Sequence, residues 1–295
     1  MAEASRRLWA HEVAQGVLAL GLWGWLLVRV GPLHPASLVM AGTAGIQLAV
    51  VVALRGSRSE LGQKARLASA YVVGLLLFSA PRLVVPALGL TVRDEQLLAV
   101  DRALFGETPA VLLTPYARPW LTELMSACYF SYLVYFHGAL AYALLRPVER
   151  GRRLFEAMFT ALPAGVAGYL LVPATGPLKA MADSFSQPLL GRPMTALNDF
   201  VVSTGSAVYD VFPSLHVFMT CVMLDHDRRE HPLRFKWMLP VAVGLVLSTV
   251  YLRYHYAIDL LAGFAWFLAW RLWWTWRGSP KDSDAPGFTQ PGETP

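Results

Sequence analysis

The chain has 295 residues, of which 55% are hydrophobic and only 15% are charged. An ordinary soluble domain carries about 25% charged residues, so this composition predicts a protein embedded in lipid. The apolar content excludes a disordered chain, and two cysteines are too few for a secreted disulfide scaffold. The net charge is +5, but we expect the basic residues to mark one side of a membrane and not a nucleic-acid surface.

Long apolar runs alternate with short charged segments along the chain. A helix needs about 20 mainly apolar residues to cross a bilayer. The candidate spans are, in order, residues 10–31, 36–54, 67–90, 121–145, 154–173, 211–225, 235–254 and 257–276. The sixth is short and begins with polar residues. We therefore predict an all-α fold, a polytopic membrane helix bundle of about eight transmembrane helices.

Three segments outside the spans are longer than simple turns. Residues 91–120 contain several charged side chains and predict a short interfacial helix before the fourth span. Residues 174–210 open with proline and glycine, and irregular backbone of this kind is tolerated at a membrane only over water or against protein. Residues 278–295 are polar and rich in proline and glycine, so we expect a mobile cytoplasmic tail.

The basic residues test this arrangement of spans. With eight spans, 16 of the 25 lysines and arginines fall in segments on the same side of the membrane. The opposite side holds Arg93, Arg102, Arg118, Lys179, Arg192 and Arg253. Because basic residues mark the cytoplasmic side, we predict a protein integral to the cell membrane with both termini in the cytoplasm.

Ionisable side chains inside apolar spans are costly, and they therefore indicate function. Two segments hold them. His216 lies where the sixth span opens, and His255 and Asp259 lie where the seventh span ends and the eighth begins. In the predicted topology both segments reach the outer, extracytoplasmic leaflet. We therefore expect the two histidines to lie at the same depth.

These residue types suit phosphoryl transfer. His255 and Asp259 are four residues apart, which places them on one face of a helix. The carboxylate can accept the Nδ1 proton of the imidazole and leave Nε2 free as a nucleophile. His216 can then serve as a proton donor. Ser214 fits a helix N-cap, and Arg253 carries a planar guanidinium that matches phosphate oxygens.

The same residues resemble two signature motifs of the phosphatidic acid phosphatase type 2 superfamily. Residues 212–216 are similar to its second motif, Pro-Ser-Gly-His, with leucine in place of glycine. Residues 248–259 are similar to its third motif, Ser-Arg, five residues, His, three residues, Asp. The leucine and the run from Tyr251 to Tyr256 resemble the branch that contains fungal inositol phosphorylceramide synthase. The resemblance is dense only over residues 169–264.

The resemblance implies a six-helix catalytic core that works without a metal or another cofactor. It implies that His255 is the nucleophile, that Asp259 orients it, and that His216 protonates the leaving oxygen and then activates the acceptor. We accordingly divide the chain into two N-terminal transmembrane helices (1–66), a catalytic membrane domain (67–277) and the tail (278–295).

The cations that hold the phosphate depart from the family pattern. The first motif, Lys, six residues, Arg-Pro, is absent, although Arg118 precedes a proline. Lys179 and Arg192 lie in the segment where that motif belongs, and we expect them, together with Arg118, to bind substrate. The third motif's arginine position is Thr249. Arg253 lies one helical turn further along the same face and is expected to reach the same phosphate.

The predicted activity is transfer of a phosphoryl or phospho-head group of a membrane lipid through a phosphohistidine intermediate. A lipid or polyol hydroxyl as acceptor makes a head-group phosphotransferase, which the branch resemblance favours, and water as acceptor makes a lipid phosphate phosphatase. Two other interpretations stay open. One is a transporter that uses His and Asp as a relay, and the other is an electron-transfer protein in which His216 and His255 ligate a haem.

Overall fold

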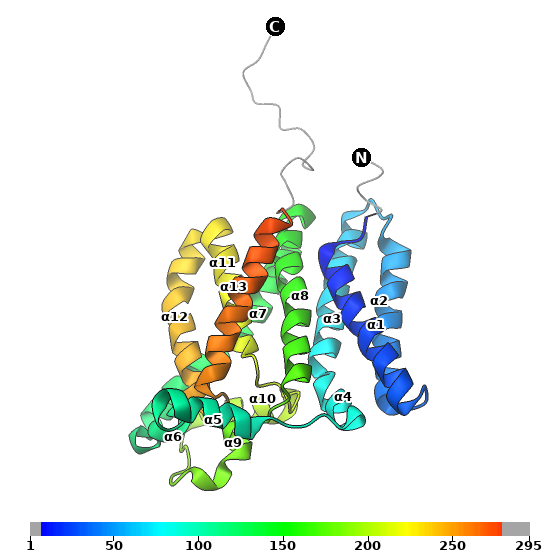
Figure 1. Cartoon of the computed structure of the whole chain (residues 1–295). Coiled ribbons are helices and arrows are strands. Elements are labelled where there is room, and N and C mark those ends of the chain that lie inside the picture. Colours follow the sequence, from blue (N-terminus) through cyan, green and yellow to red (C-terminus); the bar gives the residue numbers. More distant parts are fainter. Residues whose placement is uncertain (1–6, 279–295) are drawn as a thin grey trace.

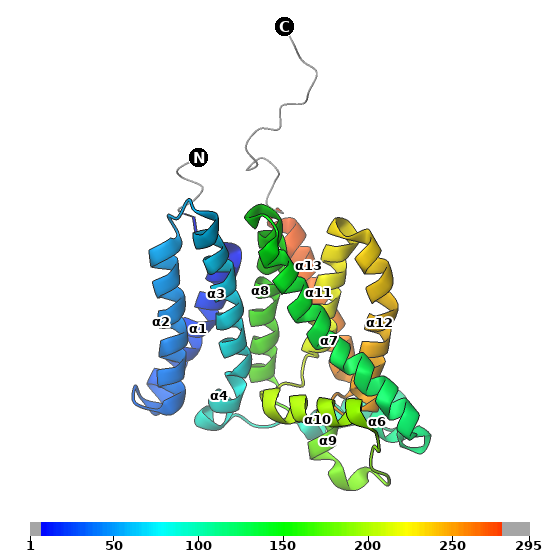
Figure 2. The ribbon, with the colours of Figure 1, turned by 180° about the vertical axis from the view of Figure 1, so that it is seen from behind.

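The computed structural model describes residues 7–278, and within that range every regular element is helical. The long helices lie side by side and run between the same two ends of the molecule (Figures 1 and 2). They are α1 (Ala10–Val30), α2 (Pro35–Leu54), α3 (Glu60–Ser79), α7 (Pro119–Leu145), α8 (Val148–Leu171), α11 (Leu215–Glu230), α12 (Pro232–Tyr251) and α13 (Ala257–Trp276). The predicted all-α membrane bundle is confirmed at this level.

Not every long helix qualifies as a membrane span by length and composition. Among the described residues, those that qualify are 10–30, 35–54, 60–88, 119–145, 148–171 and 232–251. Helix α11 has only 16 residues, and α13, although it has 20 residues, is not apolar enough, so neither belongs to this set. Helix α11 nevertheless packs beside α8 and α12, and α13 packs beside α11 and α8 (Figure 1). The count of eight spans stays a prediction.

Several helix ends differ from those predicted. The expected third span, 67–90, is a long helix followed by a short one, α4 (Pro81–Leu88). Helix α8 begins at Val148 rather than at residue 154, and α11 continues to Glu230 rather than to residue 225. These extensions are rich in Arg and Glu, which are good helix formers. Apolar content therefore located the membrane-crossing part of each helix but not its full length.

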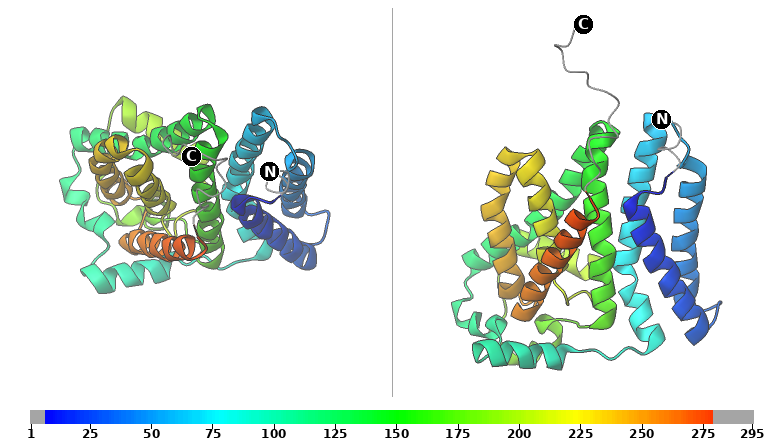
Figure 3. Two further views of the ribbon diagram at one scale, coloured as in Figure 1. Left: turned by 90° about the horizontal axis from the view of Figure 1, so that it is seen from above. Right: turned by 45° about the horizontal axis from the view of Figure 1, so that its top comes forward.

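Helix α8 is the centre of the bundle. It packs against α1, α3, α7, α11 and α13, and 83% of its most apolar stretch is buried (Figure 3). The main core cluster includes Phe155 and Phe159 of α8, Phe218 of α11 and Trp270 of α13. A Cβ added at Gly74 of α3 would lie 2.5 Å from the Phe159 ring, so the small residue allows close helix approach. The helices before α5 thereby form a layer on one side of this core.

The basic segments gather at one end of the bundle. The start of α1 and the end of α13 lie at that end, together with the connections α2–α3, α7–α8 and α11–α12 (Figure 1). The basic segments that were predicted to lie on the same side of the membrane are therefore at the same end of the bundle. Lys179, Arg192 and Arg253 belong to elements at the opposite end. Which end faces the cytoplasm stays a prediction. Arg6 and the predicted tail beyond Gly278 lie outside the described residues.

Arg66, which the topology counts among the loop charges, is an interior residue. Its side chain is 2% exposed and donates to both carboxylate oxygens of Glu12 at 2.8 and 2.6 Å, linking α3 to α1. Its guanidinium also lies 3.8 Å from the ring centroid of Trp9. Removing one partner from such a buried pair typically costs about 3–5 kcal/mol. This pair therefore ties the N-terminal layer together.

Short elements cover the other end of the bundle. They are α5 (Asp94–Phe105), α6 (Pro109–Leu112), η2 (Thr114–Tyr116), α9 (Pro177–Ala180), η3 (Ala182–Ser184) and α10 (Pro193–Gly205). Helix α5 confirms the short helix predicted within 91–120. Helix α10 packs on α7, so part of the irregular segment 174–210 lies against protein (Figure 2). This cover encloses the residues described next.

Candidate active site

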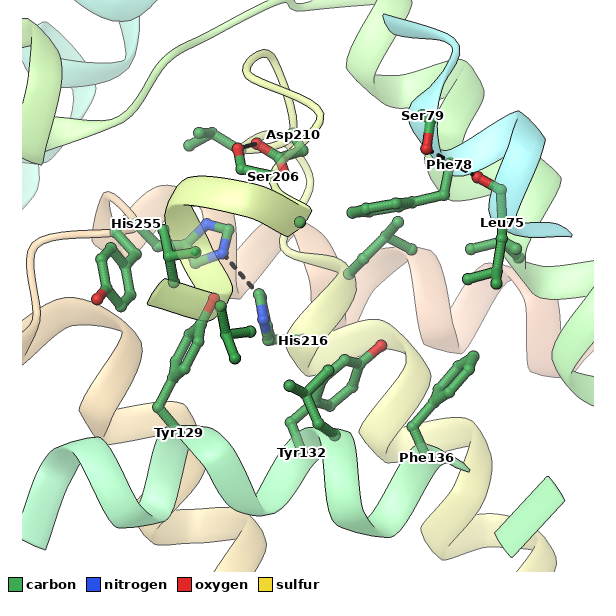
Figure 4. A pocket seen from close by; sticks show the side chains of 18 of the residues that line it. Leu75, Phe78, Ser79, Tyr129, Tyr132, Phe136, Ser206, Asp210, His216 and His255 are labelled. Carbon is green, nitrogen blue, oxygen red and sulfur yellow. Dashed lines mark hydrogen bonds between the residues drawn. The ribbon is translucent and has the colours of Figure 1, made fainter. Parts of the chain in front are cut away.

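His216 and His255 come from distant parts of the chain and meet at the covered end of the bundle. His216 lies in the first turn of α11, and His255 lies in the turn between α12 and α13. Nδ1 of His216 is 3.2 Å from Nε2 of His255, and the ring centroids are 5.3 Å apart (Figure 4). The two imidazoles are therefore close enough to contact the same substrate atom.

Asp259 lies on the other side of His255. Its Oδ2 is 3.4 Å from Nδ1 of His255 and accepts the backbone N–H of Tyr256 at 2.8 Å. Both side chains are buried, with His255 2% and Asp259 0% exposed. The prediction that the two residues share one helical face is wrong in detail, because α13 begins at Ala257. The contact forms across the N-terminal cap of that helix instead.

The protonation state of His255 suits a nucleophile. Burial lowers the pKa of His255 from 6.5 to about 4, and the Asp210 carboxylate and a hydrogen bond with the Val211 backbone oppose this shift. The imidazole is therefore neutral at neutral pH. If its proton is on Nδ1, facing Asp259, Nε2 carries the free lone pair.

Ser214 is the N-cap of α11, as predicted. Its hydroxyl accepts the backbone N–H of Val217 at 3.4 Å and lies 3.4 Å from Nε2 of His255. Its own N–H donates to the Asp259 carbonyl at 3.0 Å. A Cβ added at Gly263 would lie 2.5 Å from the Ser214 carbonyl oxygen, so this close approach of α11 and α13 requires glycine. The helix start is thus held beside His255.

The histidine pair lines one end of a cavity of about 410 Å³ (Figure 4). Lys179 and Asp210 also line the cavity. The opposite wall is mainly apolar and comes from α3, α7 and α8, with Leu75, Phe78 and Ser79 of α3 facing across the cavity from His216 (Figure 4). Val201 and Val202 of α10 also line it. The cavity therefore joins a polar reaction centre to an apolar space.

Tyrosines surround His216. The ring centroids of Tyr129 and Tyr132, both on α7, lie 4.8 and 4.7 Å from that of His216. Tyr254 lines the cavity, and its ring centroid lies 4.8 Å from that of Tyr129. Tyr251 does not line the cavity, and its hydroxyl lies 3.0 Å from the hydroxyl of Thr122. Tyr129 and Tyr132 were missed, because aromatic residues in an apolar run more often indicate core packing.

Arg253 is placed differently from the prediction. Helix α12 ends at Tyr251, and Arg253 follows it with φ 67°, so it does not continue the helical face of Thr249. Its guanidinium donates to the Gln187 carbonyl at 2.7 Å and lies 4.0 Å from the Phe185 ring centroid. It is absent from the residues that line the cavity.

Two other predicted cations also lie outside the lining. Arg192 is the N-cap of α10, and its backbone N–H donates to the Glu123 carboxylate. The Arg118 guanidinium donates to the carbonyls of Pro115 and Ala117 at 3.2 and 2.8 Å. Of the four predicted cations, Lys179 is the one that lines the described cavity.

The central arrangement is therefore a chain of Asp259, His255 and His216 in which each side chain contacts the next. Such a chain can present a neutral imidazole as nucleophile, oriented by a carboxylate, beside a second imidazole that exchanges protons. Within residues 7–278, no three His, Cys, Asp or Glu side chains cluster so as to hold a metal ion.

Comparison with known proteins gives one match. A family model described as the PAP2 superfamily matches residues 95–273, which is more than half of the chain. The matched segment runs from α5 into α13 and includes His216, His255 and Asp259. Helices α1 to α4 lie outside it. No curated protein and no solved structure matches the sequence.

Proposed function

The chain belongs to the PAP2 superfamily, and we propose that it is a membrane enzyme that transfers the phosphoryl or phospho-head group of a lipid phosphate ester. The observation that carries the proposal is the contact chain Asp259–His255–His216 at the polar end of a partly apolar cavity. Superfamily membership agrees with the motif resemblance. On the motif resemblance, we propose that the chain is similar to the branch that contains inositol phosphorylceramide synthase.

In the first half-reaction, Nε2 of His255 attacks phosphorus and the bond from phosphorus to the leaving oxygen breaks. Protonated His216 donates its proton to that oxygen. The Asp259 carboxylate accepts a hydrogen bond from the Nδ1–H of His255 and stabilises the positive charge that develops on the imidazole. The product is a phosphohistidine at His255.

In the second half-reaction, His216 takes a proton from the acceptor hydroxyl, whose oxygen attacks the phosphohistidine. The bond from phosphorus to Nε2 breaks, and neutral His255 is restored. We propose a lipid or polyol hydroxyl as the acceptor, which makes the protein a head-group phosphotransferase. The burial of His255 beneath the covering elements supports this choice, because a buried phosphohistidine is protected from water. Water as acceptor would make a phosphatase with the same residues.

The negative charge of the phosphoryl group requires donors near Nε2 of His255. Lys179 lines the cavity and supplies a positive charge. The Ser214 hydroxyl lies 3.4 Å from the nucleophilic nitrogen, and the adjacent start of α11 favours an anion through the positive end of the helix dipole. We propose that these groups act without a metal. Arg253, Arg192 and Arg118 stay proposed substrate contacts that need side-chain movement to reach the cavity.

The apolar part of the cavity suits the hydrocarbon portion of a lipid. Leu75 and Phe78 on α3 and Phe136 on α7 line it opposite the histidine pair. A phosphate ester held at His255 can therefore extend an apolar chain towards α3 and the membrane. With the basic end of the bundle assigned to the cytoplasm, the reaction takes place at the extracytoplasmic face of the cell membrane.

The histidine geometry argues against a shared haem. A metal bound to two imidazole nitrogens at about 2.0 Å each holds them about 4 Å apart on opposite sides. His216 Nδ1 and His255 Nε2 are only 3.2 Å apart, as expected for a hydrogen bond. A transporter would use the same side chains as a proton relay, so product formation is the measurement that separates it from an enzyme.

The test uses the purified full-length protein with several lipid phosphates and inositol lipids. Released phosphate indicates hydrolysis, and new lipid products indicate transfer. We expect His255→Ala to abolish both, and wild-type protein denatured during turnover to carry acid-labile phosphorus. His34→Ala, at the α1–α2 turn, is the control and should retain activity. Full activity of His255→Ala would refute the nucleophile assignment, and lipid flux into liposomes without product would favour the transporter.

A further inference from the structure

A second cavity lies at the opposite end of the bundle from the histidine pair. It measures about 380 Å³ and is formed where α7 ends, α8 begins, and the turn between α11 and α12 passes. Its charged and aromatic lining residues are Tyr142, Arg146, Arg150, His226, Glu230, His231 and Arg234. This lining is strongly basic, although the proposed reaction uses none of it.

Among residues 7–278, the charges around this cavity do not balance. Arg234 pairs with the buried carboxylate of Asp227, and Glu230 pairs with Arg153 at 3.1 Å. Within residues 7–278, no carboxylate oxygen lies within 4.0 Å of the guanidinium of Arg146 or Arg150. Two permanent positive charges therefore face the same cavity without an anionic partner.

The positions of these arginines are fixed by the local backbone. Arg146 ends α7, and Arg150 lies in the first turn of α8. A Cβ added at Gly151 would lie 2.4 Å from the Ala143 carbonyl oxygen, so the turn between the helices is tightly closed. The Arg146 guanidinium lies 5.5 Å from the Tyr142 ring centroid, within range of a cation–π contact. The basic lining is thus held by packed helices and not by a free loop.

Histidines add donors to the same lining. The rings of His226 and His231 lie 6.0 Å apart, and His231 packs edge-on against Tyr142 at 5.6 Å. An anion bound between the arginines can accept further hydrogen bonds from these imidazoles. The planar guanidinium of arginine can donate two parallel hydrogen bonds to two oxygens of one phosphate group. A phosphate group is also large enough to contact several of these side chains at once.

The surroundings of the cavity are those of a membrane boundary. Leu145 next to Arg146 is 81% exposed, and Leu233 and Trp237 at the start of α12 are 70% and 72% exposed. Exposed leucine and tryptophan at a helix end are typical of the interface between lipid and water. Basic pockets between transmembrane helices at this level bind anionic lipid head groups.

We propose that this cavity binds the phosphate group of an anionic lipid, with Arg146 and Arg150 as the residues that neutralise it. The bias of basic residues towards one side of a membrane accounts for arginines at this end of the bundle. It does not account for two arginines that line one cavity with no carboxylate partner among residues 7–278. The site lies at the other end of the molecule from His255, so it is separate from the proposed reaction centre (Figure 1).

The test measures binding, not turnover, and uses His255→Ala protein so that lipid is not consumed. Native mass spectrometry of the detergent-solubilised full chain counts bound phosphatidate, with phosphatidylcholine as the zwitterionic comparison. We expect Arg146→Gln/Arg150→Gln to lose one bound phosphatidate and to weaken its binding at least tenfold. The control is Arg55→Gln/Arg58→Gln, which removes the same charge from exposed positions at the same end of the bundle. It should bind as the parent does.

A second arm titrates the same proteins with inorganic phosphate and follows thermal stability. Phosphate binding that depends on the arginine pair would show that the site also takes free phosphate, whereas dependence for phosphatidate alone would assign it to a lipid head group. Arg150→Glu provides a single, exposed substitution in case the double variant does not fold, and it should bind phosphatidate less than the parent. Equal phosphatidate and phosphate binding by the parent, Arg150→Glu and the double variant would overturn the proposal, whether or not the protein is an enzyme.

Discussion

Asp101 of α5 holds the first turn of α13 by accepting the backbone N–H of Ile258 at 2.9 Å. Its carboxylate also accepts the N–H of Ala257 at 3.0 Å and the hydroxyl of Thr108 at 2.6 Å. The first N–H groups of a helix have no partner within the helix, so they need an acceptor from elsewhere. A side chain distant in sequence therefore fixes the turn that carries His255.

We expect Asp101→Ala to weaken both stability and catalysis. Loss of a helix cap typically costs about 0.5–2 kcal/mol, and here it leaves two partly buried N–H groups without an acceptor. The variant should unfold at lower temperature, and its kcat should fall more than its KM changes, because His255 is misplaced rather than substrate affinity lost. Glu107→Gln, which alters a neighbouring exposed acceptor, is the control. Unchanged melting temperature and kcat in Asp101→Ala would contradict this role.

The sequence allowed the pairing of His216 with His255 to be predicted, because two motifs and the alternation of spans place both at the same end of the bundle. It did not show where the third motif's helix stops. Helix α12 ends because the Thr249 carbonyl accepts the N–H groups of both Tyr254 and His255. That change of direction moves Arg253 off the helical face on which it was predicted.

Other features depend on partners that no local pattern identifies. Arg66 follows a basic loop in the sequence, yet it is buried because Glu12 lies opposite it on α1. The sequence pattern indicates that Tyr129 and Tyr132 are core aromatics. Only the position of α7 beside His216 shows that their rings contact that histidine. The sequence therefore predicted the apolar spans and the residues of the histidine pair, whereas the walls of the cavity required the tertiary structure.

The acid side of the pH profile should report His255. Protonation removes the lone pair of Nε2, so activity falls only when the pH approaches the pKa of this residue, which burial lowers to about 4. One pH unit above that value, about a tenth of the imidazole is protonated. We therefore expect the acid limb of kcat/KM, on which His255 becomes protonated, to lie below about pH 5.

Asp210→Asn tests this assignment. The Asp210 carboxylate favours the protonated form of His255, so removing its charge lowers the pKa further and should move the acid limb of kcat/KM to lower pH. Asp199→Asn, in α10, serves as the control and should leave the limb in place. A shift of the acid limb to higher pH in Asp210→Asn would show that the limb reports a different group.

Arg253 has two possible roles that a pair of variants separates. If it reaches the phosphate during turnover, Arg253→Ala should lower kcat/KM at least tenfold, which corresponds to about 1.4 kcal/mol. If it only holds the segment around Gln187, Phe185→Ala should have the same effect, because it removes the ring on which the guanidinium lies. A large loss in Arg253→Ala with a small one in Phe185→Ala supports the phosphate contact. A loss of less than tenfold in Arg253→Ala rejects it.

Helix α3 lies outside the segment that matches the family model, yet Leu75 lines the reaction cavity. If the hydrocarbon part of the substrate lies there, Leu75→Trp should fill the space and raise KM several-fold for long-chain lipid phosphates. A dihexanoyl analogue, whose short chains fill less of the apolar space, should be affected less. Val72→Trp provides the matched control, because Val72 is similarly exposed on the same helix but does not line the cavity. Equal effects of Leu75→Trp on long and short substrates would mean that α3 supports the cavity wall without selecting the chain.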